Sequence, residues 1–305
     1  MKKAKGPDFM GIGPPKTATS WMYDILAAHP ETSMPPMKEI GYWWAKEFLP
    51  EATWVTRFQD SHWFFSTRRS QIVQILESAL PRVLWNQQAR KRLAWSLRYA
   101  LLPHNDAWYD RLFDGRFMSG DITPKYCELG EKRIATLARR YPRMKIIVSL
   151  RDPVEREWSR AKMNLCSRRG RAVERVPHEE WIEHFNREWQ AEANDYAGLI
   201  ERWTRQFSAK RIHFFFFEEV VDDPWSVFLR LCEFLELGDP PESLRSVVAR
   251  PRNVGRRKEI PARYASYLFT KHRKRIEAFV RFRPDLPYPR QWLEKYGGQA
   301  NAGEI

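Results

Sequence analysis

The amino-acid sequence predicts an α/β fold, in which a central, mostly parallel sheet lies between two layers of helices. Three observations predict it. Short apolar runs alternate along the chain with amphipathic helical patterns, which is the order that parallel sheets require. The runs at 145–150 and 212–217 are almost continuously apolar, as is usual for strands buried on both faces. Charged and hydroxyl side chains follow the runs closely, at the end of the sheet where α/β folds bind ligands.

The first strand–loop–helix unit covers residues 9–30. An apolar run at 9–12 enters a turn built from glycine and two prolines, and Lys16 follows. Apolar positions then recur at helical spacing until His29 and Pro30, where proline prevents the helix from continuing. This unit therefore presents a helix N-terminus directly after a strand.

Residues 45–107 are predicted to form a helical insert, with two or three helices broken near Pro81 and Pro103. Leucine and isoleucine recur at helical spacing, and arginine or lysine fills many of the positions between them. Two interpretations stay open. The helices could pack on the core and expose a solvated cationic face, or they could cap the substrate site or contact a membrane surface.

The remaining chain continues the alternation of strands and helices. We expect strands within 117–126 and at 145–150 and 212–217, and helices at 130–140, 154–164, about 179–207 and 224–236. A cationic loop at 250–260 precedes a final helix, and a tail begins at about 283. The sequence shows no internal repeat, so we expect a single domain over residues 1–305.

The composition favours a basic globular protein. Hydrophobic residues make up 43% of the 305 residues and aromatic residues 14%, which is ample for a core. The net charge of +14 predicts attraction to anionic partners, among them nucleic acid, an acidic glycan, an anionic membrane and a polyanionic nucleotide. Three cysteines, an odd number without metal-ligand spacing, argue against a disulfide framework and against a zinc site.

Nothing in the sequence predicts secretion or a membrane span. The basic start of the chain leads into an apolar run of only four residues, which is too short for a signal peptide. No stretch approaches the roughly 18–20 apolar residues that a membrane-spanning helix needs. We therefore expect a cytoplasmic protein.

The loop after the first strand is typical of an anion site. The first N–H groups of a helix have no partner within the helix, and the helix dipole favours a negative charge beside them. Lys16 adds a positive charge. Hydroxyl donors follow it at Thr17, Thr19 and Ser20. The loop is not that of a P-loop NTPase, because Pro15 stands where those enzymes need glycine before the lysine.

This loop resembles the 5′-phosphosulfate-binding loop of sulfotransferases that use 3′-phosphoadenosine 5′-phosphosulfate (PAPS). It is most similar to the carbohydrate branch, the heparan sulfate N- and 3-O-sulfotransferases, whose loop reads roughly I-G-x-x-K-x-G-T-x-x-L. This chain reads Ile12-Gly-Pro-Pro-Lys-Thr-Ala-Thr19, so Ala18 replaces the second glycine. The resemblance implies a P-loop-like three-layer fold in which the segment from Pro15 to Trp21 binds the cofactor, with Lys16 on its 5′-phosphosulfate.

A second segment matches the family's 3′-phosphate site, which is a strand followed by Arg-x-Pro and by a helix that carries a serine. Here Arg151 and Pro153 follow the strand, and Ser159 lies on the helix. The resemblance implies that Arg151 and Ser159 bind the 3′-phosphate, and the planar fork of arginine suits two phosphate oxygens. The alternative role for Arg151 is a surface ion pair with Asp152 or Glu155.

A third segment loosely matches the C-terminal loop that family members fold over the cofactor phosphates. It holds Gly255, Arg256, Arg257 and Lys258, whose backbone freedom and positive charge suit that role. The same residues could instead form a solvated run of charge.

Glu39 matches the general base of the carbohydrate branch, where a glutamate precedes a short apolar and aromatic run. Sulfuryl transfer to a hydroxyl group needs such a base, because the acceptor oxygen loses its proton as it attacks sulfur. The alternative role for Glu39 is an ion pair with Lys38 or Lys16. Cytosolic sulfotransferases of small molecules use histidine instead, and His62 and His104 are the candidates for that role.

The chain departs from the family at 120–126. The carbohydrate branch reads G-E-K-[ST]-P-x-Y, and its lysine approaches the transferred sulfuryl group, whereas Ile122 stands at that position here. Either Lys125 has taken over this role or Lys16 suffices alone.

The sequence thus predicts a sulfotransferase that moves a sulfuryl group from PAPS to a hydroxyl or amine and leaves 3′-phosphoadenosine 5′-phosphate (PAP). We expect no metal requirement, and a small-molecule, glycan or glycolipid acceptor rather than nucleic acid. Trp21, Tyr23 or Trp158 could stack on adenine or belong to the core. The alternatives are a nucleotide-dependent kinase of the P-loop type, and a non-enzymatic protein that binds polyanions or a membrane surface.

Overall fold

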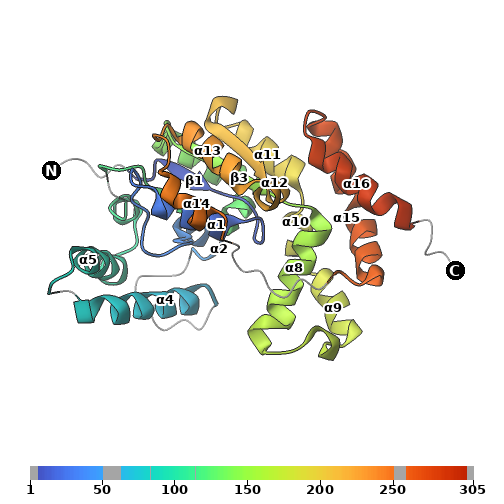
Figure 1. Ribbon diagram of the computed structural model, residues 1–305, viewed down its shortest axis with the longest axis horizontal. Helices are drawn as coiled ribbons and strands as arrows, with labels where there is room; N and C mark the ends of the chain where they lie inside the picture. Colours follow the sequence, from blue (N-terminus) through green and yellow to red (C-terminus); the bar gives the residue numbers. More distant parts are fainter. Residues whose placement is uncertain (1–5, 51–62, 83, 114, 251–258, 301–305) are drawn as a thin grey trace.

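The computed structural model describes residues 6–50, 63–82, 84–113, 115–250 and 259–300. A four-stranded sheet lies at the centre of the molecule, with the strand order β2-β1-β3-β4 and parallel pairing throughout (Figure 1). Its strands are β1 (Phe9–Gly11), β2 (Gly120–Ile122), β3 (Lys145–Leu150) and β4 (Ile212–Phe216). The predicted α/β fold with a parallel central sheet is confirmed.

Helices make up most of the remaining described chain. Around the sheet lie α1 (Thr19–Ala28), α2 (Tyr42–Phe48), α7 (Glu131–Arg140), α8 (Pro153–Leu165), α9 (His178–Phe185), α10 (Glu188–Glu192), α11 (Tyr196–Thr204), α12 (Phe217–Asp222), α13 (Pro224–Leu235), α14 (Arg245–Val248), α15 (Ala262–Phe282) and α16 (Pro287–Ala300). The insert contributes α4 (Trp63–Ala79), η1 (Leu80–Arg82), α5 (Gln87–Leu101) and α6 (Asp106–Asp110). Further 3₁₀ turns are η2 (Pro124–Glu128), η3 (Ser167–Arg169), η4 (Val173–Arg175), η5 (Ala209–Arg211) and η6 (Glu242–Leu244).

The helices form two layers, one on each face of the sheet. Successive residues of a strand point to opposite faces, so each strand contributes side chains to both layers. On one face, Phe9 and Ile147 pack with apolar residues of α1 and α13. On the other face, Met10 and Ile146 pack with apolar residues of α7, α8, α11 and α15. The sheet is therefore buried on both sides, as its apolar strands predict.

The insert contains a hairpin of two helices, α4 and α5, which pack against each other. It lies at the end of the molecule opposite α16 (Figure 1). The predicted breaks are confirmed, since Pro81 lies in η1 and Pro103 follows α5. Ile72, Trp95 and Tyr99 turn inward and join the core. Within the described ranges, no helix combines the length and the apolar character that crossing a membrane requires.

The helix predicted over 179–207 is wrong, because the segment forms three helices, α9, α10 and α11. The second break follows from a buried contact. The Asn194 side chain is buried and donates to the Glu157 carboxylate at 3.1 Å. Asp195 then begins a new helix by accepting a hydrogen bond from the Gly198 N–H at 3.1 Å.

Two further segments differ from the prediction in extent. The strand expected within 117–126 ends at Ile122, because Pro124 has no N–H for the ladder and begins the turn η2 instead. The tail after residue 283 contains α16, which starts at Pro287. Proline is tolerated in the first turn of a helix, where its missing N–H has no partner to lose.

Candidate active site

The two anion-binding segments predicted from the sequence lie side by side at the carboxyl end of the sheet. β1 pairs with β3, so the loop after β1 and the start of α8 after β3 emerge next to each other. Gly13 allows a close approach, because a Cβ at this position would lie 2.1 Å from Ser149 Oγ on β3. The Arg151 guanidinium links the two segments directly. Its Nη1 donates a hydrogen bond of 3.3 Å to the Lys16 carbonyl oxygen.

The loop after β1, residues 12–18, has an unusual backbone. Lys16 and Ala18 adopt left-handed φ angles of 78° and 71°. Left-handed residues in such loops help to turn backbone N–H groups to one side, which forms concave anion sites. The Thr17 hydroxyl donates to the Pro14 carbonyl oxygen at 2.7 Å and bonds Ser149 Oγ at 2.7 Å. This hydroxyl therefore serves the loop itself, whereas the sequence interpretation assigned it to the phosphosulfate.

Arg151 lies between the loop and α8. Besides contacting the Lys16 carbonyl, it places Nη2 3.4 Å from Glu155 Oε2 and its guanidinium 4.0 Å from the centre of the Phe217 ring. The side chain is 14% exposed, and burial lowers the pKa of this arginine. The ion pair with Glu155, named as the alternative role of Arg151, is therefore present. Arg151 also contacts the Lys16 carbonyl oxygen of the loop, a contact that a simple surface ion pair would lack.

α8 carries positive charge towards the loop. Residues spaced three or four positions apart follow one face of the helix and its start: Arg151, Glu155, Ser159 and Lys162. Ser159 is half-buried on this face. Next to it, Arg160 is largely buried, and burial together with neighbouring arginines lowers its pKa to about 10. Arg160 and Lys162 are cations of the site that the motif match did not identify.

Lys16 lies at the centre of this positive charge. Burial and, after it, the charges of four neighbouring cations lower the pKa of the Lys16 ammonium group to about 8. These four are Arg151, Arg160, Lys162 and Lys38. Cations gathered in this way repel one another unless an anion lies between them. The arrangement therefore fits a ligand that carries several negative charges.

Lys38 connects the first turn of α1 with the candidate base. Its Nζ lies 3.1 Å from each of three oxygen atoms, Thr19 Oγ1, Ser20 Oγ and Glu39 Oε1. Glu39 itself has a left-handed φ of 62°, a strained conformation that recurs at functional sites. The ion pair of Glu39 with Lys38, named as its alternative role, is thus present, and the same Lys38 contacts the first turn of α1. In the sequence, Lys38 stands out only as a neighbour of Glu39. The structure shows that Lys38 also contacts the hydroxyl groups of Thr19 and Ser20.

The end of β2 holds the Glu39 segment in place. The Glu39 N–H donates to the Ile122 carbonyl oxygen at 3.2 Å, and the Gly41 N–H donates to Thr123 Oγ1 at 3.2 Å. The Thr123 hydroxyl in turn donates to Asp121 Oδ1 at 2.7 Å. This part of the family motif therefore positions the candidate base through its backbone and its hydroxyl group.

The lysine of the family motif has no direct counterpart in this segment. The Ile122 side chain is 1% exposed and belongs to the same core cluster as Trp21, so it is a core residue. The ammonium group of Lys125 lies 2.6 Å from Glu128 Oε1 in an ion pair. Lys38, rather than Lys125, contacts the hydroxyl groups of Thr19 and Ser20 in the first turn of α1.

Two of the aromatic residues considered for adenine stacking lie in the core. Trp21 is 4% exposed, packs edge-on against Phe215 and donates its indole N–H to the Val248 carbonyl oxygen at 2.8 Å. Trp158 is 2% exposed and stacks on Trp181, with ring centres 4.6 Å apart. The core therefore covers the Trp21 ring, and the assignment of Trp21 to the cofactor stays a prediction.

Some predicted site residues lie outside the described part of the chain. They are His62, Gly255, Arg256, Arg257 and Lys258. His104 is described, and it stacks on Trp108 with ring centres 3.6 Å apart, so it contributes to the packing of the insert. Within the described ranges, no group of three or more histidine, cysteine, aspartate or glutamate side chains is arranged to hold a metal ion.

A buried polar network fixes α8 behind the site. The Arg156 guanidinium is fully buried, donates to Asn194 Oδ1 at 2.5 Å and reaches the Pro15 carbonyl oxygen of the loop at 3.4 Å. The adjacent Glu157 accepts from Asn194 and pairs with Lys271 at 3.0 Å. This network therefore fixes α8 relative to the loop at 12–18, so the cations of the site are held in place before a ligand binds.

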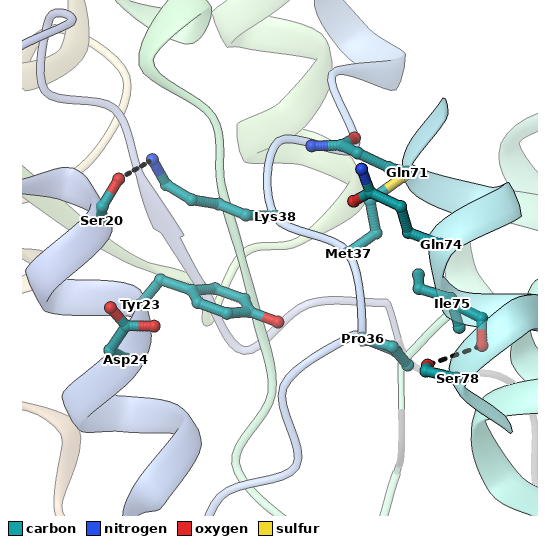
Figure 2. Close-up of a pocket in the computed structure, with 10 residues that line it drawn as sticks. All are labelled: Ser20, Tyr23, Asp24, Pro36, Met37, Lys38, Gln71, Gln74, Ile75 and Ser78. Carbon is teal, nitrogen blue, oxygen red and sulfur yellow. Dashed lines mark hydrogen bonds between the residues drawn. The ribbon is translucent and has the colours of Figure 1, made fainter. Parts of the chain in front are cut away.

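A cavity of about 410 Å³ lies beside Lys38. Figure 2 shows it between α1 and α4, with Tyr23 and Asp24 on one side and Gln71 and Gln74 on the other. Tyr23 donates its hydroxyl to a main-chain carbonyl at 2.6 Å, and it lines this cavity rather than the cation cluster. Lys38 lines the cavity and also contacts Thr19 at the N-terminus of α1, so the cavity adjoins the anion site.

Comparison with known proteins identifies the family of this chain. The model of a family described as "Sulfotransferase family" matches residues 7–241. The matched region contains all four strands, the loop at 12–18, Glu39 and α8. The chain therefore belongs to the sulfotransferase family.

Curated relatives match about half of the chain. Carbohydrate sulfotransferase 15 of Mus musculus is 30% identical over 166 residues, which is 50% of this chain and 26% of that protein. The Homo sapiens protein of the same name is 28% identical over 168 residues, with the same two shares. The chain thus spans about a quarter of the length of these relatives.

Solved sulfotransferase structures resemble most of the chain. The sulfotransferase from Alicyclobacillus acidocaldarius gives a TM-score of 0.55 at 20% identity, covering 90% of this chain and 96% of that one. The sulfotransferase domain of the Synechococcus PCC 7002 olefin synthase gives a TM-score of 0.56 at 18% identity, with the same coverage. At these identities the likeness concerns the fold, and it supports the P-loop-like three-layer architecture.

Proposed function

We propose that this chain transfers a sulfuryl group from PAPS to a hydroxyl or amine group of a carbohydrate-type acceptor and releases PAP. The observation that carries the proposal is the cluster of five cations centred on Lys16, beside the N-terminus of α1. Membership of the sulfotransferase family supports PAPS as the donor. The similarity to proteins named carbohydrate sulfotransferase 15 supports the acceptor class.

The two anionic ends of PAPS fit two parts of the site. The 5′-phosphosulfate would lie on the loop and the first turn of α1, where Lys16 supplies charge and N–H groups supply donors. The 3′-phosphate would lie between Arg151 and Ser159 on the start and face of α8. The residues from Gly255 to Lys258 are proposed to cover the nucleotide.

PAPS supplies an activated sulfuryl group: the acceptor oxygen bonds to sulfur while the bond between sulfur and the phosphate oxygen breaks, and PAP leaves with the electron pair. Glu39 is the proposed base that takes the acceptor proton, a contribution of roughly 10²–10⁴-fold. Lys38 lies between Glu39 and the hydroxyl groups of Thr19 and Ser20 in the first turn of α1. Lys38 is therefore placed to neutralise the negative charge of the transferred group. In the family this is the role of a lysine at the position where this chain has Ile122.

The cavity beside Lys38 is the proposed acceptor site. Its volume of about 410 Å³ falls within the range of about 300–1,000 Å³ that is usual for small-ligand sites. The carboxamides of Gln71 and Gln74 and the Asp24 carboxylate supply both donors and acceptors, which suits the hydroxyl groups of a sugar. An acceptor bound there would approach Lys38 and, next to it, the Glu39 carboxylate.

Calorimetric titration with PAP, ATP and AMP, without metal, tests the donor assignment. We expect selective binding of PAP, because AMP and ATP have no 3′-phosphate for Arg151 to bind. The Arg151→Ala variant is expected to lose this preference. Arg205→Ala is the matched control, because Arg205 also pairs with a glutamate four residues away, at 2.7 Å, but on an exposed surface.

Two outcomes of this titration would contradict the proposal. Equal binding of the three nucleotides would indicate a protein that binds polyanions without regard to their structure. A preference for ATP that depends on Mg²⁺ would indicate a kinase. Selective PAP binding that survives Arg151→Ala would keep the donor and reject the 3′-phosphate site.

A further inference from the structure

The hairpin of α4 and α5 exposes large apolar side chains. Leu84 is 81% exposed and Trp85 72%, and both lie in the turn between the two helices. Leu80, just before this turn, is 54% exposed. Along α5, Leu97 and Leu101 lie one turn apart and are 44% and 60% exposed. We call these five residues the hairpin surface. Leu80, Leu84 and Trp85 gather at the turn, Leu97 and Leu101 lie along α5, and large apolar side chains that gather in an exposed place mark an interaction site.

The same segment is strongly basic. Between residues 80 and 101 the chain has no aspartate or glutamate and five cationic residues: Arg82, Arg90, Lys91, Arg92 and Arg98. Arg90, Lys91 and Arg92 are exposed on the first turns of α5. Arg82 and Arg98 donate hydrogen bonds to main-chain carbonyl groups, and these neutral groups do not cancel the positive charge of the two arginines. The hairpin surface therefore combines apolar contact area with uncompensated positive charge along its own segment.

We propose that the hairpin surface docks on a membrane that contains anionic phospholipids. Tryptophan and leucine side chains enter the boundary between headgroups and acyl chains, while lysine and arginine face the lipid phosphates. Nucleic acid or an acidic glycan would use the cations but would leave Leu84 and Trp85 without a role. The hairpin lies at one end of the molecule, opposite α16, so it can approach a flat surface (Figure 1).

Docking in this way also has a consequence for the acceptor. Gln71 and Gln74 of α4 line the cavity beside Lys38, so the hairpin that docks is also a wall of the proposed acceptor site. A membrane-bound protein would then have its acceptor site close to the lipid surface, which suits a glycolipid. This consequence rests on the proposed function, whereas the docking itself does not.

Vesicle sedimentation tests the docking. The vesicles contain phosphatidylcholine alone, or phosphatidylcholine mixed with phosphatidylglycerol. We expect binding to the mixed vesicles and little to the neutral ones. The double variant Leu84→Ser/Trp85→Ser is expected to bind the mixed vesicles about tenfold more weakly or worse. Arg90→Gln/Lys91→Gln is expected to lose about 30-fold, because each cation near an anionic surface contributes about fivefold.

The matched control is Leu229→Ser/Phe282→Ser, which removes two apolar side chains, 38% and 40% exposed, from helices outside the hairpin. It is expected to bind vesicles as the unaltered protein does. Thermal melting of every variant checks that the fold is kept, which the exposure of all these side chains favours. Equal binding to both vesicle types, or equal loss in the control, would overturn the proposal. So would unchanged binding of Leu84→Ser/Trp85→Ser together with displacement by heparin, which would indicate a general polyanion site.

Discussion

The Lys16→Met substitution removes a charge that the folded protein holds at an electrostatic cost. Burial is the main cause, and the four cations around Lys16 add to it. Methionine keeps an unbranched apolar stem of similar length and has no charge to bury. We therefore expect Lys16→Met to stabilise the unliganded protein and, at the same time, to abolish tight PAP binding.

The size of the effect follows from the pKa of Lys16. It falls from 10.5 to about 8 in the folded chain, so the protonated form is disfavoured there by about 3 kcal/mol. The free energy of unfolding is expected to rise by up to about 3 kcal/mol at pH 7. With the unfolding entropy usual for a chain of this length, the Tm would rise by about 5 °C.

The sign of the effect depends on pH. Below pH 8, Lys16 is charged in the folded and the unfolded state, so the full cost is present. Between pH 8 and 10.5 the unfolded chain holds a proton that the folded chain has released, so the unaltered protein gains stability from this group as pH rises. The advantage of Lys16→Met therefore shrinks across this window. Calorimetric unfolding at pH 7 and at pH 10 measures the difference.

The same pKa predicts how binding varies with pH. With a pKa of about 8, the charged fraction of Lys16 falls about 30-fold between pH 7 and pH 9.5. The phosphates of PAP are already almost fully ionised at pH 7. The affinity for PAP is therefore expected to fall about 30-fold over this range. Lys16→Arg keeps its charge there and is expected to lose this part of the pH dependence.

Lys210→Met is the control for stability, because Lys210 is exposed and lies outside the cation cluster. It is expected to change the Tm little. The reasoning is refuted if Lys16→Met is less stable than the unaltered protein at pH 7. It is equally refuted if the difference between the two proteins does not shrink towards pH 10.

Three further substitutions test other parts of the site. Glu39→Gln is expected to lower kcat by about 10²-fold or more without changing PAP affinity, and full activity would remove the base assignment. Ala18→Gly is expected to raise the free energy of unfolding by about 0.5–1 kcal/mol in urea titration, because a φ of 71° strains alanine; a loss of stability would show that the strain is absent. Gln71→Leu is expected to raise the acceptor KM about fivefold with p-nitrophenyl glycosides, and an equal effect of the exposed Gln88→Leu would exclude a specific contact.

Local pattern was enough to predict the parts of the fold whose residues repeat regularly. The strand at 145–150 and the helix at 154–164 have uninterrupted periods and clear ends, and both are present within one residue at each end. The segment at 179–207 has helical periodicity throughout, and pattern alone could not locate its breaks. The second break depends on the contact of Asn194 with Glu157, which belongs to a distant part of the sequence.

The site residues, too, fall into those that a local pattern could predict and those that depend on distant contacts. Lys16 and Arg151 could be found from motifs, because each belongs to a strand–loop–helix unit whose local sequence sets its geometry. Lys162 could have been found by following the face of α8 onward from Arg151 in steps of three or four residues. Lys38 could not, because its contact with Thr19 and Ser20, 19 and 18 residues earlier in the chain, depends on the fold and not on a local pattern.

Backbone strain and repulsion between cations both occur at the site where we expect the ligand to bind. In the described chain, four residues other than glycine have a left-handed φ, and three of them are Lys16, Ala18 and Glu39. Burial and, after it, repulsion from neighbouring cations lower the pKa of Lys16 at the same place. The buried network around Arg156 holds these groups together against that cost, since it ties α8 to the loop from behind. An anion that lies between the cations relieves the repulsion, so we expect PAP to bind tightly. PAP should stabilise the fold most below pH 8, where Lys16 is charged.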